Sequence, residues 1–240
     1  MIDPFLENVK AALLNQEWFD PKQVTRTVRF GIVDDLDGVL LPKLITTLQE
    51  QAPGVRLTVR DIDYQLIDQL LQSGDTDVVV AAILPAIQQK EHHRLLYTDH
   101  FVALFDQAQL RLEPVLDMET YLGTAQILVS LRGDTTGMID APLQEMGLAR
   151  DVMTTLTKFS TLPLVLKQTK ALCNVPTTIA RFLADYYGLE TRDLPLKSPE
   201  FTIGVAWRRE LNADPFTRWF VDLVAQLMTE QREAVKRVGA

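Results

Sequence analysis

The feature that most constrains this chain is a regular alternation of strand-like and helix-like segments in its first third. Phe30, Ile32 and Val33 predict a buried strand, and residues 78–83 are a continuous apolar run typical of a strand covered on both faces. Residues 55–59 alternate apolar and polar side chains, which is typical of a strand with one wet face. Between these strands, residues 41–52 and 66–71 repeat leucines at helical spacing. A βαβαβ series of this kind predicts a largely parallel sheet with helices on both faces.

The same order of segments restarts in the second half of the chain. Apolar runs predict strands at 101–105, 127–129, 152–156 and 171–173, and helical spacing predicts helices at 139–146, 162–166 and 179–186. Near the end, residues 201–207 predict one more strand, and Asp214-Pro215 is a typical start for a long final helix. We therefore expect two α/β halves of similar size, not one continuous sheet, with the last helix returning to the first half.

Composition excludes several classes of protein. The 240 residues are 47% apolar, enough for one large or two smaller cores, and the net charge of −8 disfavours nucleic-acid binding by this chain alone. No apolar stretch approaches the roughly 20 residues that span a bilayer, and the N-terminal residues lack the pattern of a secretory signal. Cys173 is the single cysteine, which excludes an internal disulfide and fits a reducing compartment. These features predict a cytoplasmic protein.

The catalytic and metal-binding motifs that we looked for are missing from the sequence. It contains no Walker loop, dinucleotide glycine fingerprint, nucleophile elbow or HExxH pair. His92 and His93 are adjacent in a charged connector, so their side chains diverge, and no third ligand lies near them. His100 lies near a strand start, from which it could reach a cleft, but a structural placement is the simpler interpretation. Cys173 lies in an apolar strand without an identifiable base, which indicates a core thiol. We therefore predict no cofactor and no metal.

Three carboxylates, Asp34, Asp35 and Asp37, follow the first strand where the next helix begins. Taken singly, each is most simply a helix-capping or solubilising residue, and spacing alone leaves a pair of catalytic carboxylates open. Their spacing does not fit a calcium loop. Because ligands in open α/β sheets bind outside the carboxyl ends of the strands, the three together predict the rim of a binding cleft.

Polar and aromatic residues follow four other expected strands. They lie in Ile83-Leu84-Pro85, Ser130-Leu131-Arg132, Phe159-Ser160-Thr161 and Asn174-Val175-Pro176. Ordinary turn chemistry explains each residue alone. Together, the hydroxyls, guanidinium, amide and aromatic ring suit a small polar or aromatic ligand.

The order of these segments resembles the effector-binding domain of LysR-type transcriptional regulators, and the nodulation and aromatic-degradation regulators in particular. The resemblance covers nearly the whole chain and is carried by FDPKQVTRTVRFGIVDD, LLPKLITTLQEQAPGVRLTV, GDTDVVVA, FVALFD, GMIDAPLQEMGLARDVMTTLTKFSTLPLVL, ALCNVPTTIARFLA, LPL and DPFTRWFVDLV.

The resemblance implies an α/β fold of the type 2 periplasmic-binding-protein kind, with two Rossmann-like lobes joined by a double crossover hinge. Residues 1–21 would be the end of a linker helix and a connector. Lobe I would comprise 22–103 plus 205–240, and lobe II would comprise 104–204. The crossover strands would lie near 101–105 and 201–207.

The resemblance also implies an effector site between the lobes. The expected contacts are Asp34, Asp35, Leu36 and Ile83 from lobe I, Ser130, Leu131, Arg132, Phe159, Ser160 and Asn174 from lobe II, and Trp207 at the hinge. Many relatives carry small hydroxyl residues in the first loop, where this chain carries carboxylates. That difference counts against a simple anionic effector, although Arg132 and free helix amides could still receive one.

The implied partners are a small aromatic or organic acid and a second copy of the domain, with a tetramer in the complete regulator. DNA would be contacted only through a winged helix-turn-helix that this sequence does not contain. The chain is then either an isolated sensor domain or a relative without the DNA-binding part.

Two other functions stay open on the same fold. A solute-binding protein of a transporter is disfavoured because no signal sequence or lipobox cysteine is visible. An enzyme such as a prephenate-type dehydratase would need a catalytic acid in the cleft, and Asp34 or Asp35 would be the candidate.

Overall fold

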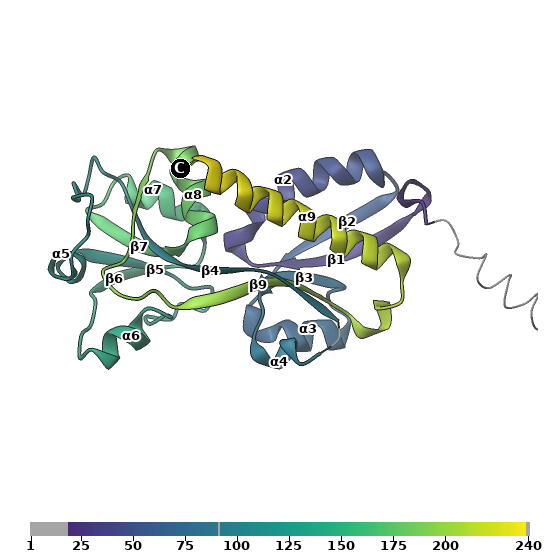
Figure 1. The fold of residues 1–240 in the computed structure, drawn as a ribbon, viewed down its shortest axis with the longest axis horizontal. Helices are drawn as coiled ribbons and strands as arrows, with labels where there is room; N and C mark the ends of the chain where they lie inside the picture. Colours follow the sequence, from purple (N-terminus) through teal and green to yellow (C-terminus); the bar gives the residue numbers. More distant parts are fainter. Residues whose placement is uncertain (1–18, 91, 239–240) are drawn as a thin grey trace, which may run out of the picture.

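The computed structural model describes residues 19–90 and 92–238 (Figure 1). Its strands are β1 Arg26–Ile32, β2 Val55–Asp61, β3 Val78–Ala82, β4 His93–Phe105, β5 Ala125–Val129, β6 Val152–Leu156, β7 Ala171–Pro176, β8 Glu190–Arg192 and β9 Glu200–Trp207. Its α-helices are α2 Asp34–Gln51, α3 Ile67–Ser73, α4 Pro85–Gln88, α5 Met118–Gly123, α6 Asp140–Glu145, α7 Leu162–Leu166, α8 Thr177–Tyr187 and α9 Pro215–Val238. Four short 3-10 helices are η1 Pro21–Gln23, η2 Tyr64–Leu66, η3 Phe159–Thr161 and η4 Arg209–Leu211.

The strands of the described residues form one hydrogen-bonded path in the order β2-β1-β3-β9-β4-β7-β5-β6, with β8 beside β4. Strand pairing is parallel within each half, as expected, but β9 and β4 run antiparallel to their neighbours. The path is continuous because β4 is 13 residues long. It pairs with β9 as far as His100 and with β7 from Phe101 onward. The expected interruption between the halves is therefore absent from the hydrogen bonding.

Two lobes are nevertheless distinct, and Figure 1 shows them side by side along the long axis of the molecule. We name lobe I the part built on β1, β2, β3, β9 and the start of β4, and lobe II the part built on the end of β4 and β5 to β8. The chain crosses once in β4 and again before β9, which starts at Glu200. The double crossing is as expected, and the boundaries at 103/104 and 204/205 stay a prediction about which residues move together.

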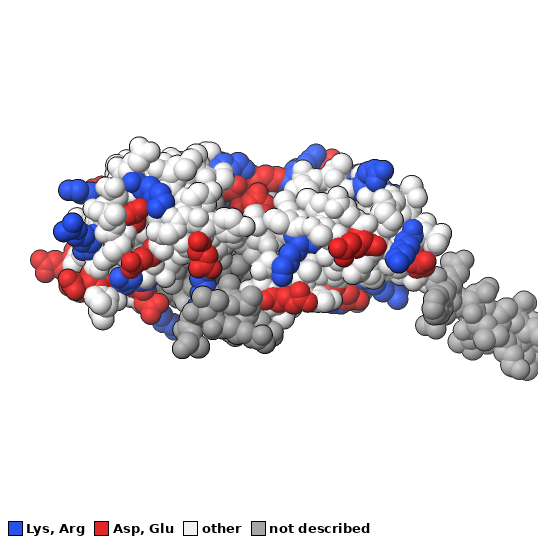
Figure 2. Space-filling view, turned by 90° about the horizontal axis from the view of Figure 1, so that it is seen from above, with Lys and Arg blue, Asp and Glu red and all other residues white. Residues whose placement is uncertain are grey.

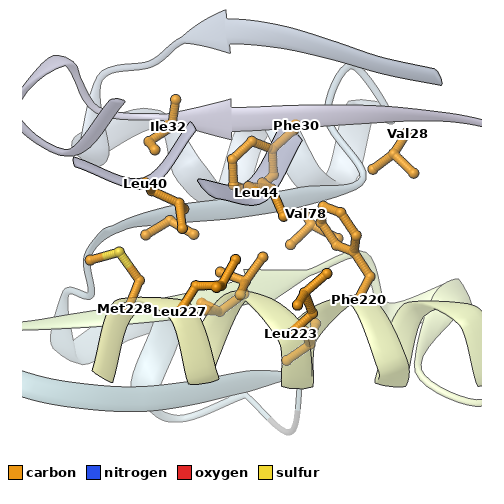
Figure 3. Close-up of a cluster of buried hydrophobic side chains, with 14 of the residues drawn as sticks. Val28, Phe30, Ile32, Leu40, Leu44, Val78, Phe220, Leu223, Leu227 and Met228 are labelled. Atoms are coloured by element: carbon orange, nitrogen blue, oxygen red, sulfur yellow. The ribbon is translucent and has the colours of Figure 1, made fainter. Parts of the chain in front are cut away.

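The core of lobe I lies on both faces of its strands. On one face, β1, β3 and β9 pack against α2 and α9 (Figure 3). The α9 side chains Phe216, Phe220, Leu223 and Leu227 recur at helical spacing, and full burial of one such side chain contributes about 1.5–3 kcal/mol. On the other face, β3 packs against α3 and α4. Helices therefore cover both faces of these strands, as the alternating pattern predicts.

Lobe II repeats this layering with its own two clusters. Residues of α7 and α8 pack on one face of β4, β5 and β7. Residues of α5 and α6 pack on the opposite face, around the fully buried Tyr121 and Phe105. Val39 of α2 belongs to the first cluster, so lobe I helix α2 also packs against lobe II. This contact brings the start of α2 to the junction between the lobes.

Several helix ends follow the sequence signals. Gly74 ends α3 and Gly188 ends α8, both in the left-handed conformation that glycine adopts without strain. The Asp214 side chain accepts a hydrogen bond from the backbone N–H of Thr217 and so caps α9.

Two local expectations were wrong, and a third concerns residues that the structure does not describe. Helix α2 begins at Asp34 and not at residue 41, where the expected helix starts, so Pro42 lies inside the helix. The charged connector expected around His92 is partly a strand, because β4 already begins at His93. The end of the linker helix expected within residues 1–21 lies outside the described residues. Among the helices that the structure describes, none is long and apolar enough to cross a bilayer.

Candidate functional site between the lobes

The strand-end loops of the two lobes meet across their junction. Asp34 is the first residue of α2, directly after β1, and its carboxylate accepts a 2.5 Å hydrogen bond from the backbone N–H of Phe159 at the end of β6. The Lys158 ammonium pairs with Asp61 at the end of β2, and lies 3.7 Å from the Asp34 carboxylate. Opposite charges from the two lobes therefore face each other at short range.

A second ion pair crosses the junction nearby. The Arg132 guanidinium donates to Asp63 of lobe I at 2.9 Å and also pairs with Asp134 of its own loop. We name this set of contacts the rim, and it consists of Asp34, Asp61 and Asp63 from lobe I with Arg132, Lys158 and the N–H of Phe159 from lobe II. Figure 2 shows Asp and Glu side chains gathered where the lobes meet, with basic side chains beside them.

A second group of polar contacts lies deeper at the junction. Asp99 of β4 is only 2% exposed, and its carboxylate accepts hydrogen bonds from the backbone N–H of Thr178 and the hydroxyl of Thr177. These residues begin α8, so a carboxylate from β4 caps a lobe II helix whose own N-cap, Pro176, offers no side chain bond. The Tyr97 hydroxyl lies 3.2 Å from the Thr178 hydroxyl. We name these four residues the inner seam.

Asp35 lies beside the inner seam and is half-buried in the first turn of α2. Burial raises the pKa of its carboxyl to about 7, with a further contribution from the charge of Asp99. The pKa of Asp37 is also raised by burial, and its carboxylate accepts a hydrogen bond from the N–H of Gly38. The N-cap of α2 is Val33, so none of the three aspartates caps the helix as the simplest interpretation had it.

Comparison with known proteins decides the family. Residues 21–229 match the model of the LysR substrate binding domain. The chain belongs to this family. It is 28% identical over 223 residues to the transcriptional activator NahR of Pseudomonas putida, covering 92% of this chain and 74% of NahR. It is 26% identical over 223 residues to Nodulation protein D 3 of Rhizobium leguminosarum bv. phaseoli, covering 92% and 73%.

Solved structures agree with this assignment. The regulatory domain of MexT, a transcriptional activator in Pseudomonas aeruginosa, superposes with a TM-score of 0.73 at 28% identity, covering 84% of this chain and 100% of that domain. The expected fold of a LysR effector-binding domain is therefore confirmed. Family members are transcription regulators that bind small-molecule effectors and oligomerise.

Five of the expected effector contacts of this LysR domain lie at the junction between the lobes, and each has a polar or partly exposed side chain. Asp34 and Arg132 belong to the rim. The Phe159 ring is half-buried, Ser160 is exposed, and Leu131 is 45% exposed. Ser130 lies at the base of the same loop, where its hydroxyl bonds Asp134. Together with Asp35, these residues belong to the segments of the two lobes that meet at the junction.

The other expected contacts are placed differently. Leu36 and Ile83 are buried in the two cores of lobe I. Asn174 is buried inside lobe II, where its amide donates to the Tyr121 hydroxyl and the Gln126 carbonyl oxygen. It points there because Asn174 shares a face of β7 with Leu172, which packs on the α5 side.

Trp207 does not lie at the hinge. It pairs with Val78 at the start of β3, whereas the hinge end of β9 pairs Glu200 with His100. Seven residues of strand separate the two ends, which is roughly 20 Å. The expectation failed because β9 runs antiparallel to β3, so its C-terminal end lies at the edge of the sheet opposite the strand-end loops.

The polar residues at the junction that sequence reasoning missed include Asp61, Asp63, Asp99 and Lys158. Lys158 could have been predicted, because it directly precedes Phe159 in a segment that the sequence already indicated as a strand end. Asp61 and Asp63 follow the period-two strand at 55–59 and could have been found by the same rule. Asp99 had no signal, since its partners in α8 lie 78 and 79 residues further along the chain.

Redox and metal chemistry receive no support from the described residues. Cys173 is fully buried, and burial raises the pKa of its thiol to about 12, which suppresses the reactive thiolate. Among the residues that the structure describes, no three His, Cys, Asp or Glu side chains are grouped to hold a metal ion.

Two surface hollows lie away from the junction. One of about 610 Å³ adjoins α3 and η4 and is lined by Lys90, His92 and Arg209 among others. The pKa of His92 is lowered there by burial and by the neighbouring cations. The other, of about 420 Å³, lies between the start of β4 and α9. Neither contains a residue of the rim or the inner seam.

Proposed function

We propose that this LysR domain senses a small polar molecule bound between its lobes, with aromatic and organic acids as the first class to test. The observation that carries this proposal is the meeting of strand-end loops from both lobes at the rim. The proposed contacts are Asp34, Asp35, Ser130, Leu131, Arg132, Phe159 and Ser160, with Leu36, Ile83 and Asn174 behind them.

The chemistry of these contacts suits recognition of a polar ligand. Arg132 offers a planar fork of donors and is 44% exposed, so a carboxylate or phosphate group can reach it from solvent. The hydroxyl of Ser160 and the partly exposed ring of Phe159 lie next to each other on η3. Asp34 and Asp35 give the opposite wall a negative charge, which favours ligands that also carry a donor or cationic group.

Binding would act through the relative placement of the lobes. A ligand shifts the balance between two arrangements only by its difference in affinity for them, and couplings of about 1–3 kcal/mol are usual. We propose that a second copy of the domain pairs with this one, as a dimer or within a tetramer of the complete regulator. The ligand-dependent placement would reach DNA through that assembly. We also infer a cytoplasmic location, where such a regulator meets DNA.

A thermal-shift screen tests this proposal. The chain is heated with a panel of aromatic and organic acids, and a specific ligand raises the melting temperature by mass action. Titration calorimetry then measures the Kd for each ligand found. We expect Arg132→Ala and Ser160→Ala to weaken binding by about tenfold, which is the loss of one hydrogen bond to a charged group.

The matched control is Lys90→Ala, which removes a cation from the hollow beside α3 and should leave the Kd unchanged. An equal loss in all three variants would place the ligand outside the junction or indicate general unfolding. Binding that ignores both Arg132→Ala and Ser160→Ala would contradict the proposed site.

Catalysis is the alternative that Asp35 keeps open. A half-buried carboxyl whose pKa is near 7 suits a general acid. We propose binding without turnover, because the relatives NahR and Nodulation protein D 3 are named as a transcriptional activator and a nodulation protein. An assay with prephenate decides: product that forms with the wild-type chain and disappears with Asp35→Asn would establish an enzyme.

A further inference from the structure

We propose that the rim is a latch, in which the chain's own charges hold the two lobes together before any effector is bound. This inference goes beyond effector binding, because it concerns the resting arrangement of the lobes. It is carried by polar contacts that cross the junction from two separate loops of lobe II to three separate positions of lobe I.

The ion pairs of the rim join loops whose strands are not paired with each other, whereas Asp34 and Phe159 also meet where α2 packs against lobe II. Asp61 and Asp63 follow the edge strand β2, and Lys158 and Arg132 follow the strands β6 and β5 at the other end of the sheet. Strands β2 and β6 are the two ends of the hydrogen-bonded path, so backbone pairing cannot bring them together. The ion pairs Asp61–Lys158 and Asp63–Arg132 link these distant loops directly.

Asp34 has a particular role in the latch. The backbone N–H of Phe159 and the ammonium of Lys158 are both donors that an anionic group could use. In this structure the Asp34 carboxylate takes the N–H at 2.5 Å and lies 3.7 Å from the ammonium. The carboxylate of Asp34, which belongs to lobe I, thus occupies hydrogen-bond donors of lobe II that an anionic ligand could otherwise use.

The ion pairs of the latch are weak enough to break and re-form. The side chains of Lys158 and Arg132 are 40% and 44% exposed, and those of their partners Asp61 and Asp63 are 32% and 12% exposed, so water and salt reach the pairs from the lobe II side. Exposed pairs are weak and are screened over about 10 Å at 0.1 M ionic strength and about 3 Å at 1 M. Contacts of this kind bias an arrangement without locking it, as a switch requires.

The distance between the lobes tests the latch directly. Nitroxide labels at Gln69→Cys on α3 and Gln144→Cys on α6 report this distance by double electron–electron resonance. Both positions are exposed, and the helices α3 and α6 lie in different lobes on the same side of the sheet (Figure 1). Cys173 is fully buried and stays unlabelled in the folded chain. No effector is needed, so the test is independent of the proposed function.

We expect a single short distance in the otherwise unchanged chain at about 0.1 M salt, and a shift to longer, broader distances at about 1 M. Lys158→Ala with Arg132→Ala should give the same shift at low salt. So should Asp34→Ala with Asp61→Ala and Asp63→Ala, which opens the latch from the other lobe. Distances that stay short in both variants would overturn the proposal.

Two controls separate the latch from general loosening. Asp222→Ala breaks an exposed 2.6 Å pair with Arg94 inside lobe I and should leave the distance unchanged. Arg132→Glu should lengthen the distance, and adding Asp63→Arg should shorten it again by restoring opposite charges. A lengthening in Asp222→Ala, or no recovery in the double variant, would also overturn the proposal.

Discussion

The two lobes meet in two ways that differ in depth. The inner seam is buried, and its central carboxylate, Asp99, is 2% exposed and held by hydroxyl and backbone donors. The rim is open to water on its lobe II side, where its cations are 40% and 44% exposed. Buried hydrogen bonds to a charge are costly to lose, whereas exposed ion pairs contribute little. The inner seam should therefore hold the fold, and the rim should set the arrangement of the lobes.

The largest expected effect is at the inner seam. Asp99→Ala leaves the buried N–H of Thr178 and the hydroxyl of Thr177 without their acceptor, and should lower the free energy of unfolding by about 3 kcal/mol. Urea denaturation at pH 5 measures this, because Asp35 is mostly protonated there and its repulsion with Asp99 does not contribute. A loss no larger than that of the surface variant Asp222→Ala would contradict a structural role for the inner seam.

Asp35 gives the second effect, and its sign depends on pH. Its pKa is about 7 in the folded chain against an ordinary value of 3.8, so the folded state binds the extra proton between these values. The stability that protonation supplies is full below about pH 4 and is lost as the pH rises through 7. Asp35→Asn keeps the neutral form at every pH. It should gain about 1–2 kcal/mol over wild type at pH 8, allowing for the partial exposure of the side chain.

Urea melts of both proteins at pH 4 and pH 8 check this prediction. The difference between Asp35→Asn and wild type should shrink toward zero at pH 4. A variant that is equally or less stable than wild type at pH 8 would show that Asp35 carries no buried charge at that pH.

Tyr97→Phe should have a smaller effect. It removes the hydroxyl that lies 3.2 Å from the Thr178 hydroxyl and keeps the ring over which the Arg232 guanidinium sits at 4.4 Å. We expect a loss of about 1 kcal/mol, the usual contribution of one hydrogen bond. Urea denaturation with Tyr186→Phe, on an exposed ring, as the control measures the difference.

The smallest effect on stability is expected at the rim. Lys158→Ala should change the free energy of unfolding by less than about 1 kcal/mol, because exposed pairs with Asp61 and Asp34 contribute little. The same variant, combined with Arg132→Ala, should still change the distance between the lobes. A loss of stability near that of Asp99→Ala would show that the rim stabilises the fold as strongly as the inner seam does.

The sequence predicted the elements of this fold better than their partners. Local signals such as Gly74, Gly188 and Asp214-Pro215 act within one turn of the chain, so they can be read directly. The acceptor role of Asp34 toward Phe159 spans 125 residues, and nothing local reports it. The rule that binding clefts lie at the carboxyl ends of strands predicts that both residues lie at the same junction. It does not predict the hydrogen bond between them.

Strand direction was the other property that local patterns did not contain. A strand that returns after a long excursion has the same apolar pattern whether it runs parallel or antiparallel, and this ambiguity misplaced Trp207. The pattern in β7 also did not tell that Asn174 faces the interior of lobe II, because all six residues of that strand are buried.

The length of β4 limits the kinds of motion that the domain can make. Since the same 13-residue strand is hydrogen-bonded into both lobes, sliding one lobe past the other would break its ladders with β9 and β7. Twisting or bending around the peptide that joins His100 to Phe101 keeps both ladders intact. Effector binding should accordingly change the angle between the two lobes. The resulting displacement of an atom should grow with its distance from that peptide.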